Sequence, residues 1–317
     1  MEKKFVSVVT YLHNDSAEVS SFLDSVVNII GKSFEQYEVI LVDDACEDDT
    51  VLQIEDFVKK NNLDGMVTII HMGIYQGVES SMNAGRDIAI GDFVYEFDSC
   101  YIDYDSELVI DVYDELLKGF DIVSASSDSR MKFTSKLFYR LYNKSNRGFS
   151  KIGPETFRII SRRAINRIKS ISKNIPYRKA VYANCGLKMT SLSYKTNSDG
   201  YLNKKKSQAF SKRSALALDS FIYFTNVLEK VSLIISILFL LITAAMGTYA
   251  IVDYFLESGI TEGWSSTISF ISMGFFGVFF LLTIIMKYLS VMLNLIFKQS
   301  KYLVADVEKV SGNRNDD

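Results

Sequence analysis

The chain has 317 residues, of which 48% are hydrophobic and 23% are charged, a composition close to that of ordinary globular proteins. The formal net charge of −3 gives no general reason to expect binding to nucleic acid. Three cysteines, Cys46, Cys100 and Cys185, are widely spaced and form no CxxC pair. The sequence therefore indicates neither a disulfide framework nor a zinc site, and it suits a reducing compartment.

The first half of the chain alternates short apolar runs with segments of helical spacing. We expect the first helix to end at Gly31. Strands that are apolar throughout are buried on both faces, so the pattern predicts an α/β domain over residues 1–202, with a mainly parallel sheet between helices. Strands are predicted at residues 5–12, 37–42, 67–72, 93–97 and 121–125, and helices at 19–30, 51–58, 78–90 and 108–117.

Polar side chains follow three of these strands where each strand ends. Asn14 and Asp15 follow the first strand, Asp43 and Asp44 follow the second, and Asp98 follows the fourth. The carboxyl ends of parallel strands meet at one sheet edge, which is where α/β proteins bind ligands. Carboxylates there can accept hydrogen bonds from a base or ribose, or hold a divalent cation against phosphate. Asp98 has a second interpretation, as the cap of the next turn or helix.

Glycine-rich phosphate loops are absent from the sequence. Neither GxGxxG nor GxxxxGK[ST] occurs anywhere in the chain. These loops cradle the phosphates of dinucleotides and of nucleoside triphosphates. Their absence counts against a dinucleotide enzyme and against a P-loop NTPase.

Residues 203–297 differ in character from the first part of the chain. The segment 203–230 places lysine and arginine before apolar residues at helical spacing. This predicts an interfacial helix on the cytoplasmic leaflet, with an amphipathic helix packed on the soluble domain as the alternative. Two long apolar runs follow, at 231–252 and at about 268–289. At 1.5 Å per residue, each can cross a hydrocarbon core of roughly 30 Å, which predicts a transmembrane hairpin.

The charges beside these runs predict an orientation in the membrane. The connector 253–267 has acids but no lysine or arginine, whereas both outer flanks carry lysines. The positive-inside rule therefore places the first domain and residues 298–317 in the cytoplasm of a multi-pass cell-membrane protein. Within this tail, we expect the residues after Leu303 to be disordered because they are charged and rich in asparagine and aspartate. A helical hairpin buried in a soluble protein is the alternative.

Several motifs of the first part resemble the family 2 glycosyltransferases of the GT-A fold. The resemblance covers residues 4 to about 165 and rests on the order and spacing of four sequence motifs. With the two apolar runs included, the chain resembles the polyprenyl-phosphate glycosyltransferases, such as the dolichyl-phosphate mannose synthases. The matching pieces are VVTYLHND, EVILVDDACEDDT, YQGVESSMNAGRDIAIGDFVYEFDS and FRIISRRAI.

The resemblance implies roles for individual residues. Asp98 matches the first acid of the metal-binding DxD motif and would hold Mg²⁺ or Mn²⁺. Arg158 matches the arginine of the acceptor motif and, with Arg130, would hold the acceptor phosphate. The nucleotide of a sugar donor would be bound by Tyr11, His13, Asp15, Asp43, Asp44, Gly77 and Asn83.

The sequence departs from the family pattern at two motifs. Cys100 stands where DxD has its second acid, so the cation would be held either with help from Asp103 or by Asp98, phosphate and water alone. The acceptor motif, usually GDFR, reads ETFR at 155–158, which keeps Arg158 and loses the acid before the phenylalanine.

The resemblance predicts an inverting hexosyltransferase that makes cell-envelope polysaccharide precursors. It would move a sugar from a nucleotide-sugar donor to polyprenyl phosphate at the cytoplasmic leaflet. Two alternatives remain, namely transfer to a lipid-linked or surface glycan, and an inactive nucleotide-sugar-binding scaffold subunit. The expected partners are donor, lipid acceptor and membrane lipid, without nucleic acid, and a homo-oligomer is left open.

Overall fold

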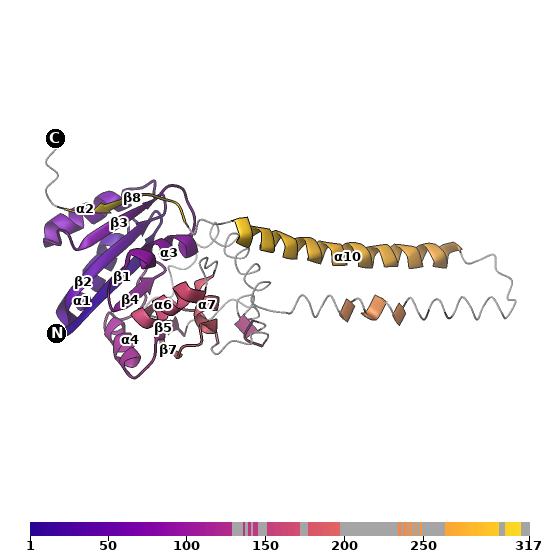
Figure 1. Ribbon diagram of the computed structural model, residues 1–317. Coiled ribbons are helices and arrows are strands. Elements are labelled where there is room, and N and C mark those ends of the chain that lie inside the picture. The colour runs from indigo at the N-terminus through magenta and orange to yellow at the C-terminus, as the bar shows by residue number, and fades with distance from the viewer. Residues whose placement is uncertain are drawn as a thin grey trace. The chain divides into compact units, whose positions relative to one another are not determined.

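The computed structural model describes residues 1–128, 151–171, 177–196, 264–297 and 302–311, with scattered residues at 136–144 and 234–248. Contacts divide the chain into two compact units. The first contains Met1–Leu216 together with Gln299–Asp317, and the second contains Ala217–Lys298 (Figure 1). Arg130, the predicted interfacial helix at 203–230 and most of the first predicted span lie outside the described residues.

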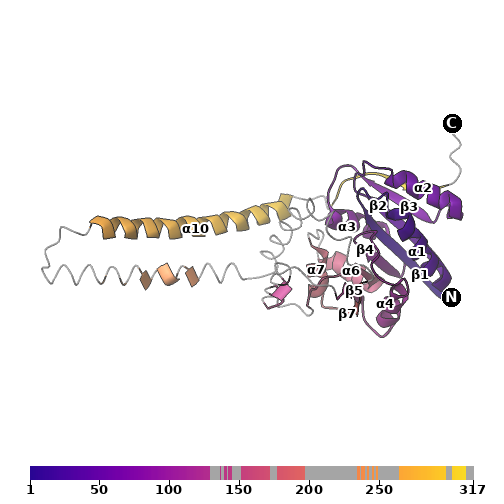
Figure 2. The same cartoon turned by 180° about the vertical axis from the view of Figure 1, so that it is seen from behind.

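Within the described residues, the first unit is built on one eight-stranded sheet with helices on both faces (Figures 1 and 2). All five predicted strands and all four predicted helices are present, which confirms the α/β fold class. The elements are β1 (Glu2–Leu12), α1 (Val19–Ser33), β2 (Phe34–Asp43), α2 (Thr50–Asn61), β3 (Val67–Met72), α3 (Val78–Ile88), β4 (Phe93–Phe97), α4 (Leu108–Leu117), β5 (Ile122–Ser127), β6 (Phe157–Ser161), α6 (Arg162–Ile171), α7 (Arg178–Asn184), β7 (Met189–Tyr194) and β8 (Val304–Lys309).

The end predicted for the first helix was wrong. Helix α1 continues through Gly31 to Ser33. A Cβ atom at position 31 would lie 3.4 Å from the hydroxyl oxygen of Tyr37 on β2. This distance is an ordinary van der Waals contact, so the glycine is not required for packing here, and it does not stop the helix.

The strand order is β7-β5-β6-β4-β1-β2-β3-β8. Four neighbouring pairs are parallel, β1 with β2 and β4, β2 with β3, and β5 with β7, so the sheet is mainly parallel as predicted. Strand β6 runs antiparallel between β4 and β5. Its register places Arg158 opposite Glu96. The strands β1, β2 and β4 end at the same edge, because Leu12 pairs with Asp43 and Thr10 with Phe97.

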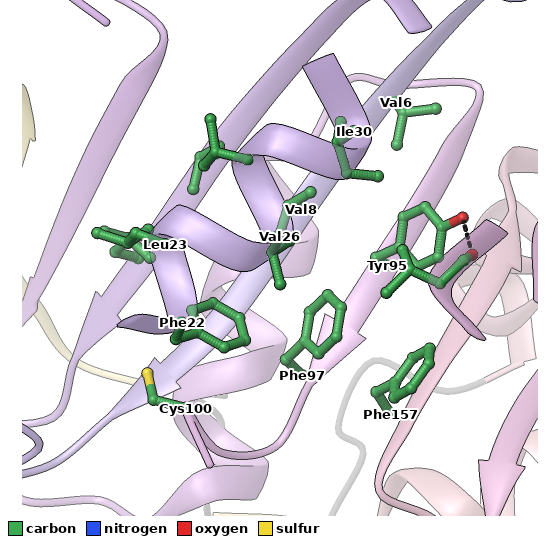
Figure 3. Close-up of a cluster of buried hydrophobic side chains, with 14 of the residues drawn as sticks. Val6, Val8, Phe22, Leu23, Val26, Ile30, Tyr95, Phe97, Cys100 and Phe157 are labelled. Atoms are coloured by element: carbon green, nitrogen blue, oxygen red, sulfur yellow. Dashed lines mark hydrogen bonds between the residues drawn. The ribbon is translucent and has the colours of Figure 1, made fainter. Parts of the chain in front are cut away.

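One face of the sheet forms the main hydrophobic core. Helix α1 contributes a row of buried side chains at helical spacing, which pack on alternate residues of β1 and β4 (Figure 3). The hydroxyl of Tyr95 enters this core and donates a hydrogen bond to the backbone oxygen of Val109, 2.7 Å away. Cys100 lies at the end of this cluster, where Figure 3 shows its side chain beside Phe22.

The opposite face of the sheet is covered by α3, which packs very closely on it. A Cβ atom built on Gly85 would overlap Val9, and it would lie 2.8 Å from Cγ2 of Val42. Both valines are rigid, buried side chains of central strands and cannot move aside. The close approach of α3 therefore requires glycine at position 85.

Strand β8 corrects the prediction of a disordered C-terminal tail. Residues Val304–Lys309 pair antiparallel with β3, with Ile70 opposite Val307. The strand covers the free edge of β3, which would otherwise expose unpaired backbone groups. Figure 1 shows β8 beside β3 at this edge of the sheet. The chain thus returns to the first unit after the second.

In the second unit, the structure describes one long helix, α10 (Trp264–Phe297), which contains the second predicted span. Large apolar side chains of this helix are exposed, among them Phe276 and Phe279. None of the helices in the described part of the chain meets the length and apolar character required to cross a membrane. The transmembrane hairpin therefore stays a prediction.

The close packing at Gly85 yields a first testable prediction. Gly85→Ala should lower the free energy of unfolding of the full-length protein by about 1–3 kcal/mol, the usual cost of overpacking a core. Urea unfolding followed by circular dichroism measures this change. The control is Gly153→Ala, because a Cβ atom at Gly153 meets nothing within 4 Å. Equal stability of both variants and the wild type would contradict the close approach.

Candidate active site

The loops that follow β1 and β2 are tied together at the carboxyl edge of the sheet. The backbone N–H of Glu47 donates to the side-chain oxygen of Asn14 (2.8 Å), and that of Asp15 donates to the Thr50 hydroxyl (2.9 Å). Asn14 and Ala45 both have positive φ angles, 55° and 54°. A non-glycine residue in this region is strained, and such strain concentrates at functional sites. The two strand ends therefore form one fixed surface.

Asp44 organises the third loop of this edge. Its carboxylate accepts hydrogen bonds from the backbone N–H groups of Gln76 and Gly77, each at 2.7 Å, and from the Tyr11 hydroxyl at 3.1 Å. Gly77 has a φ of +84°, which favours glycine at this turn. Burial, with the neighbouring Asp44 carboxylate, raises the pKa of Tyr11, so its hydroxyl remains a donor. Three of the predicted nucleotide residues thus form one contact group.

His13 and Asp43 border this group. The Nδ1 atom of His13 lies 2.8 Å from the backbone oxygen of Asp44, and its ring stands 4.5 Å from that of Tyr75. Asp43 contacts Nδ1 of His71 at 2.9 Å. The carboxylate of Asp15 accepts the backbone N–H of His13 at 2.9 Å. The structure therefore brings six of the seven predicted nucleotide residues together, all except Asn83.

A buried charge cluster lies on the α3 face of the sheet, centred on Glu96 of β4. The Glu96 carboxylate is fully buried and accepts hydrogen bonds from Arg158 (2.9 Å), Arg178 (2.8 Å) and the Tyr182 hydroxyl (2.8 Å). Arg86 of α3 donates to the same hydroxyl at 2.9 Å. All three arginines are fully buried. Strand β4, strand β6 and helices α3 and α7 therefore meet around one carboxylate.

Asp98 is the part of this cluster nearest to solvent. Its two carboxylate oxygens accept hydrogen bonds from Arg158 (2.9 Å) and Arg178 (2.7 Å), and its side chain is 22% exposed. Burial opposes the charged form, but the two guanidinium groups outweigh it and hold the pKa of Asp98 well below its usual range. Asp98 therefore remains an anion that two cations share.

The Nε donors of Arg158 and Arg178 are also paired. Arg158 Nε donates to Glu155 at 3.0 Å, and Arg178 Nε donates to Glu79 at 2.9 Å. Asn83 accepts a hydrogen bond from Arg86 at 2.7 Å and is 2% exposed. Asn83 therefore contacts the charge cluster, and its role in nucleotide binding stays a prediction.

The residues around Asp98 fit a divalent cation only in part. The side chain of Cys100, at the second DxD position, packs in the apolar cluster beside Phe22 (Figure 3). Asp103 is buried and accepts a hydrogen bond from the Tyr194 hydroxyl at 2.7 Å. The described residues include no group of three or more potential metal ligands. Asp98 is thus the one acid of the motif at this edge, and a cation would need further ligands from substrate and water.

Five members of the charge cluster were not predicted from the sequence: Glu79, Arg86, Glu96, Arg178 and Tyr182. A detectable signal was present for Glu96, because a glutamate inside the apolar run FVYEF is unusual for a buried strand. Arg86 lies on the face of α3 that also carries buried Met82 and Gly85. Arg178 gave no local signal, since a lone arginine is ordinarily a surface residue.

The mainly parallel sheet, with acidic loops at the carboxyl ends of its central strands, has the architecture of the GT-A fold. Residues 7–182 match the model of the family described as Glycosyl transferase family 2. The chain belongs to this family.

Known relatives agree with this assignment. The chain is 28% identical to the uncharacterized glycosyltransferase sll0501 of Synechocystis sp. over 58% of its length, and 24% identical to the uncharacterized glycosyltransferase YkcC of Bacillus subtilis over 59%. It spans 59% of the length of each of these curated relatives. The mannosyltransferase PcManGT from Pyrobaculum calidifontis, solved with GDP-Man and Mn²⁺, shares the fold with a TM-score of 0.52 and 12% identity, over 95% of this chain and 89% of its own.

The buried cluster yields a second testable prediction. Glu96→Gln removes a charge that neutralises buried arginines, and breaking such a pair costs about 3–5 kcal/mol. Urea unfolding of the full-length protein should show a loss of this size. Glu35→Gln is the matched control, because Glu35 is exposed on β2. A loss below about 1 kcal/mol for Glu96→Gln would contradict the role of the cluster in stability.

Asp98 yields a prediction about pH. Its pKa is lowered in the folded protein, so its ionised form stabilises the fold fully above the unfolded pKa of about 3.9, and this contribution is lost as pH falls further. At pH 7, Asp98→Asn should cost about 1.5–3 kcal/mol, the range for hydrogen bonds to charged groups. The difference from wild type should shrink below pH 4 in urea titrations. A difference that is independent of pH would contradict the ion pairs.

Proposed function

We propose that this glycosyltransferase moves a hexose from a nucleotide-sugar donor to polyprenyl phosphate at the cytoplasmic leaflet, with inversion at the anomeric carbon. The main support for the proposal is that the Asp44 group and Asp98 lie at the same edge of the sheet. The Asp44 group, with its fixed backbone loops, lies at the ends of β1 and β2. Asp98, with its two arginines, lies at the end of the neighbouring strand β4.

The Asp44 group supports donor binding. Tyr11, His13 and Tyr75 are partly exposed and surround backbone groups that Asp44 and Asp15 hold in place. Aromatic faces and fixed polar groups are suited to a nucleoside, which needs stacking and hydrogen bonds at once. The shared fold with PcManGT, which was solved with GDP-Man and Mn²⁺, supports a nucleotide-sugar donor.

The cluster at Asp98 supports the transfer chemistry. A phosphate oxygen of the acceptor is already anionic at neutral pH, so it attacks the sugar without a general base from the protein. Arg158 and Arg178 are fully buried and paired with glutamates, so they hold Asp98 in place, and neither Arg158 nor Arg178 reaches the acceptor phosphate. Asp98 would hold Mg²⁺ or Mn²⁺, which would stabilise the negative charge of that leaving group.

The second unit supports a lipid acceptor. Exposed phenylalanines of α10 form an apolar surface that water solvates poorly and lipid accommodates. The predicted apolar run at 231–252 and the basic segment at 203–230 add to this support. We therefore propose membrane attachment through the second unit, with the first unit on the cytoplasmic side. A site held near the headgroups meets a soluble donor and a lipid acceptor together.

A transfer assay tests the proposal. Purified full-length protein in vesicles that contain undecaprenyl phosphate should form a solvent-extractable lipid-linked sugar with one nucleotide sugar of a panel, when Mg²⁺ or Mn²⁺ is present. Arg130→Ala should reduce this product at least tenfold by raising KM for the acceptor, since bidentate phosphate binding is lost. Arg163→Ala is the control, because Arg163 is a largely exposed residue paired with Asp121.

Three results would contradict parts of the proposal. If product forms only with a glycan acceptor, the acceptor is a growing glycan and not polyprenyl phosphate. Nucleotide binding without transfer to any acceptor would favour the scaffold interpretation. Full activity of Arg130→Ala would remove Arg130 from the acceptor site.

A further inference from the structure

The side chain of Gln76 holds the segment that enters strand β8. Its Nε2 atom donates to the backbone oxygen of Leu303 at 2.7 Å, and its Oε1 atom accepts the backbone N–H of the same residue at 2.9 Å. The backbone N–H of Gly73 donates to that oxygen as well, at 3.1 Å. The Gln76 amide therefore extends the pairing of β3 with β8 beyond Met72 and Val304, the last residues in register.

The main chain of Gln76 is held from the other side. Its backbone N–H donates to the Asp44 carboxylate at 2.7 Å, as does the backbone N–H of Gly77. Tyr75, the residue before Gln76, places its ring centroid 4.5 Å from that of His13 in the Asp44 group. A single residue therefore joins the returning C-terminal segment to the loop that borders the proposed donor site.

Strand β8 buries few of its own side chains. Five of its six residues are exposed, and the strand lies at the edge of the sheet. Elements with few buried contacts and exposed backbone hydrogen bonds open at a low cost in free energy. Near the start of β8, a further hydrogen bond runs from the Tyr302 hydroxyl to Asp87 of α3, at 3.1 Å. The two hydrogen bonds of Gln76 are therefore a substantial part of what keeps this end of β8 in place.

We propose that Gln76 is a positioning residue of the donor site, through which the docking of β8 and the binding of a nucleoside diphosphate strengthen each other. This inference rests on the proposed donor site at the Asp44 group. While β8 is docked, Gln76 is fixed at its main chain and at its side chain. A nucleotide that binds a loop already ordered avoids the entropy cost of ordering it. By linkage, the nucleotide must stabilise docked β8 by the same factor.

Hydrogen–deuterium exchange of the full-length protein in detergent tests this coupling. Mass spectrometry follows peptides that cover residues 73–77 and 304–309, with and without a panel of nucleoside diphosphates that includes UDP and GDP. The nucleotide that binds should slow exchange in both segments. In β8 we expect a change of about fivefold, which corresponds to one ordinary hydrogen bond.

Two variants remove the connection from opposite ends. Gln76→Ala deletes both hydrogen bonds of the side chain, whereas Leu303→Pro deletes only the backbone N–H that donates to Oε1 of Gln76. Each should speed exchange in β8, raise the Kd of the nucleotide about fivefold and abolish the protection of β8 by the nucleotide. In the transfer assay, the loss should appear in KM for the donor and not in kcat.

The controls separate this coupling from a general loss of stability. Leu303→Ala keeps the backbone N–H, and the leucine side chain that it removes is 54% exposed. Gln36→Ala removes an exposed glutamine near the start of β2. Both variants should bind the nucleotide and show protection of β8 like the wild type. The double variant Gln76→Ala with Leu303→Pro should weaken binding no more than Gln76→Ala alone, because both changes remove the same connection.

Several outcomes would overturn the inference. A nucleotide that protects residues 73–77 and leaves β8 unchanged shows that the two segments are independent, while the proposed donor site stands. Additive effects of Gln76→Ala and Leu303→Pro show that the two residues do not act through one connection. Failure of every nucleoside diphosphate to bind the wild type contradicts the proposed function and removes this inference with it. Coupling in a protein that transfers no sugar supports this inference and contradicts only the proposed transfer.

Discussion

The carboxylate of Glu96 is the constraint on which the candidate site depends. An ionised group inside a sheet is very costly unless it is paired and hydrogen-bonded. Here a strand and a helix from distant parts of the chain supply arginines, and Tyr182 adds its hydroxyl. Side chains two residues apart in a strand share a face, and Asp98 follows Glu96 at this spacing. The same two arginines therefore contact both acids. The ion pairs that stabilise the fold also fix the position of Asp98 in the candidate site.

A second constraint acts on the loop after β3. Asp44 fixes the backbone of Gln76 and Gly77 from one side. The Gln76 side chain makes two hydrogen bonds with the backbone of Leu303, at 2.7 and 2.9 Å, immediately before β8. The loop is thus held between the sheet and the returning C-terminal strand. Residues on both sides of the apolar segment are therefore required to complete the edge where the donor is proposed to bind.

Most of the correct predictions, namely the central strands and the sheet edge with its acids, rest on apolar runs and on the polar residues that follow them. The buried runs of β1, β2 and β4 are mostly apolar, which is typical of strands buried on both faces of a parallel sheet. The acids that follow these strands mark the carboxyl edge of the sheet. Strand β8 escaped prediction because five of its six residues are exposed, so no buried face imposes an alternating pattern. Strand β6 gives only a weak signal for a different reason, because it is five residues long and carries Arg158 between its apolar residues.

The sequence by itself determined the alternation of strands and helices, the edge at which acids gather, and the membership of a glycosyltransferase family. Those properties follow from local periodicity and from residue order. Only the tertiary structure decided that Asp98 faces two arginines while Cys100, two residues later, faces the core. Arg178 is separated from Glu96 by 82 residues. Such a contact arises from the packing of α7 on β4, and no local pattern records it.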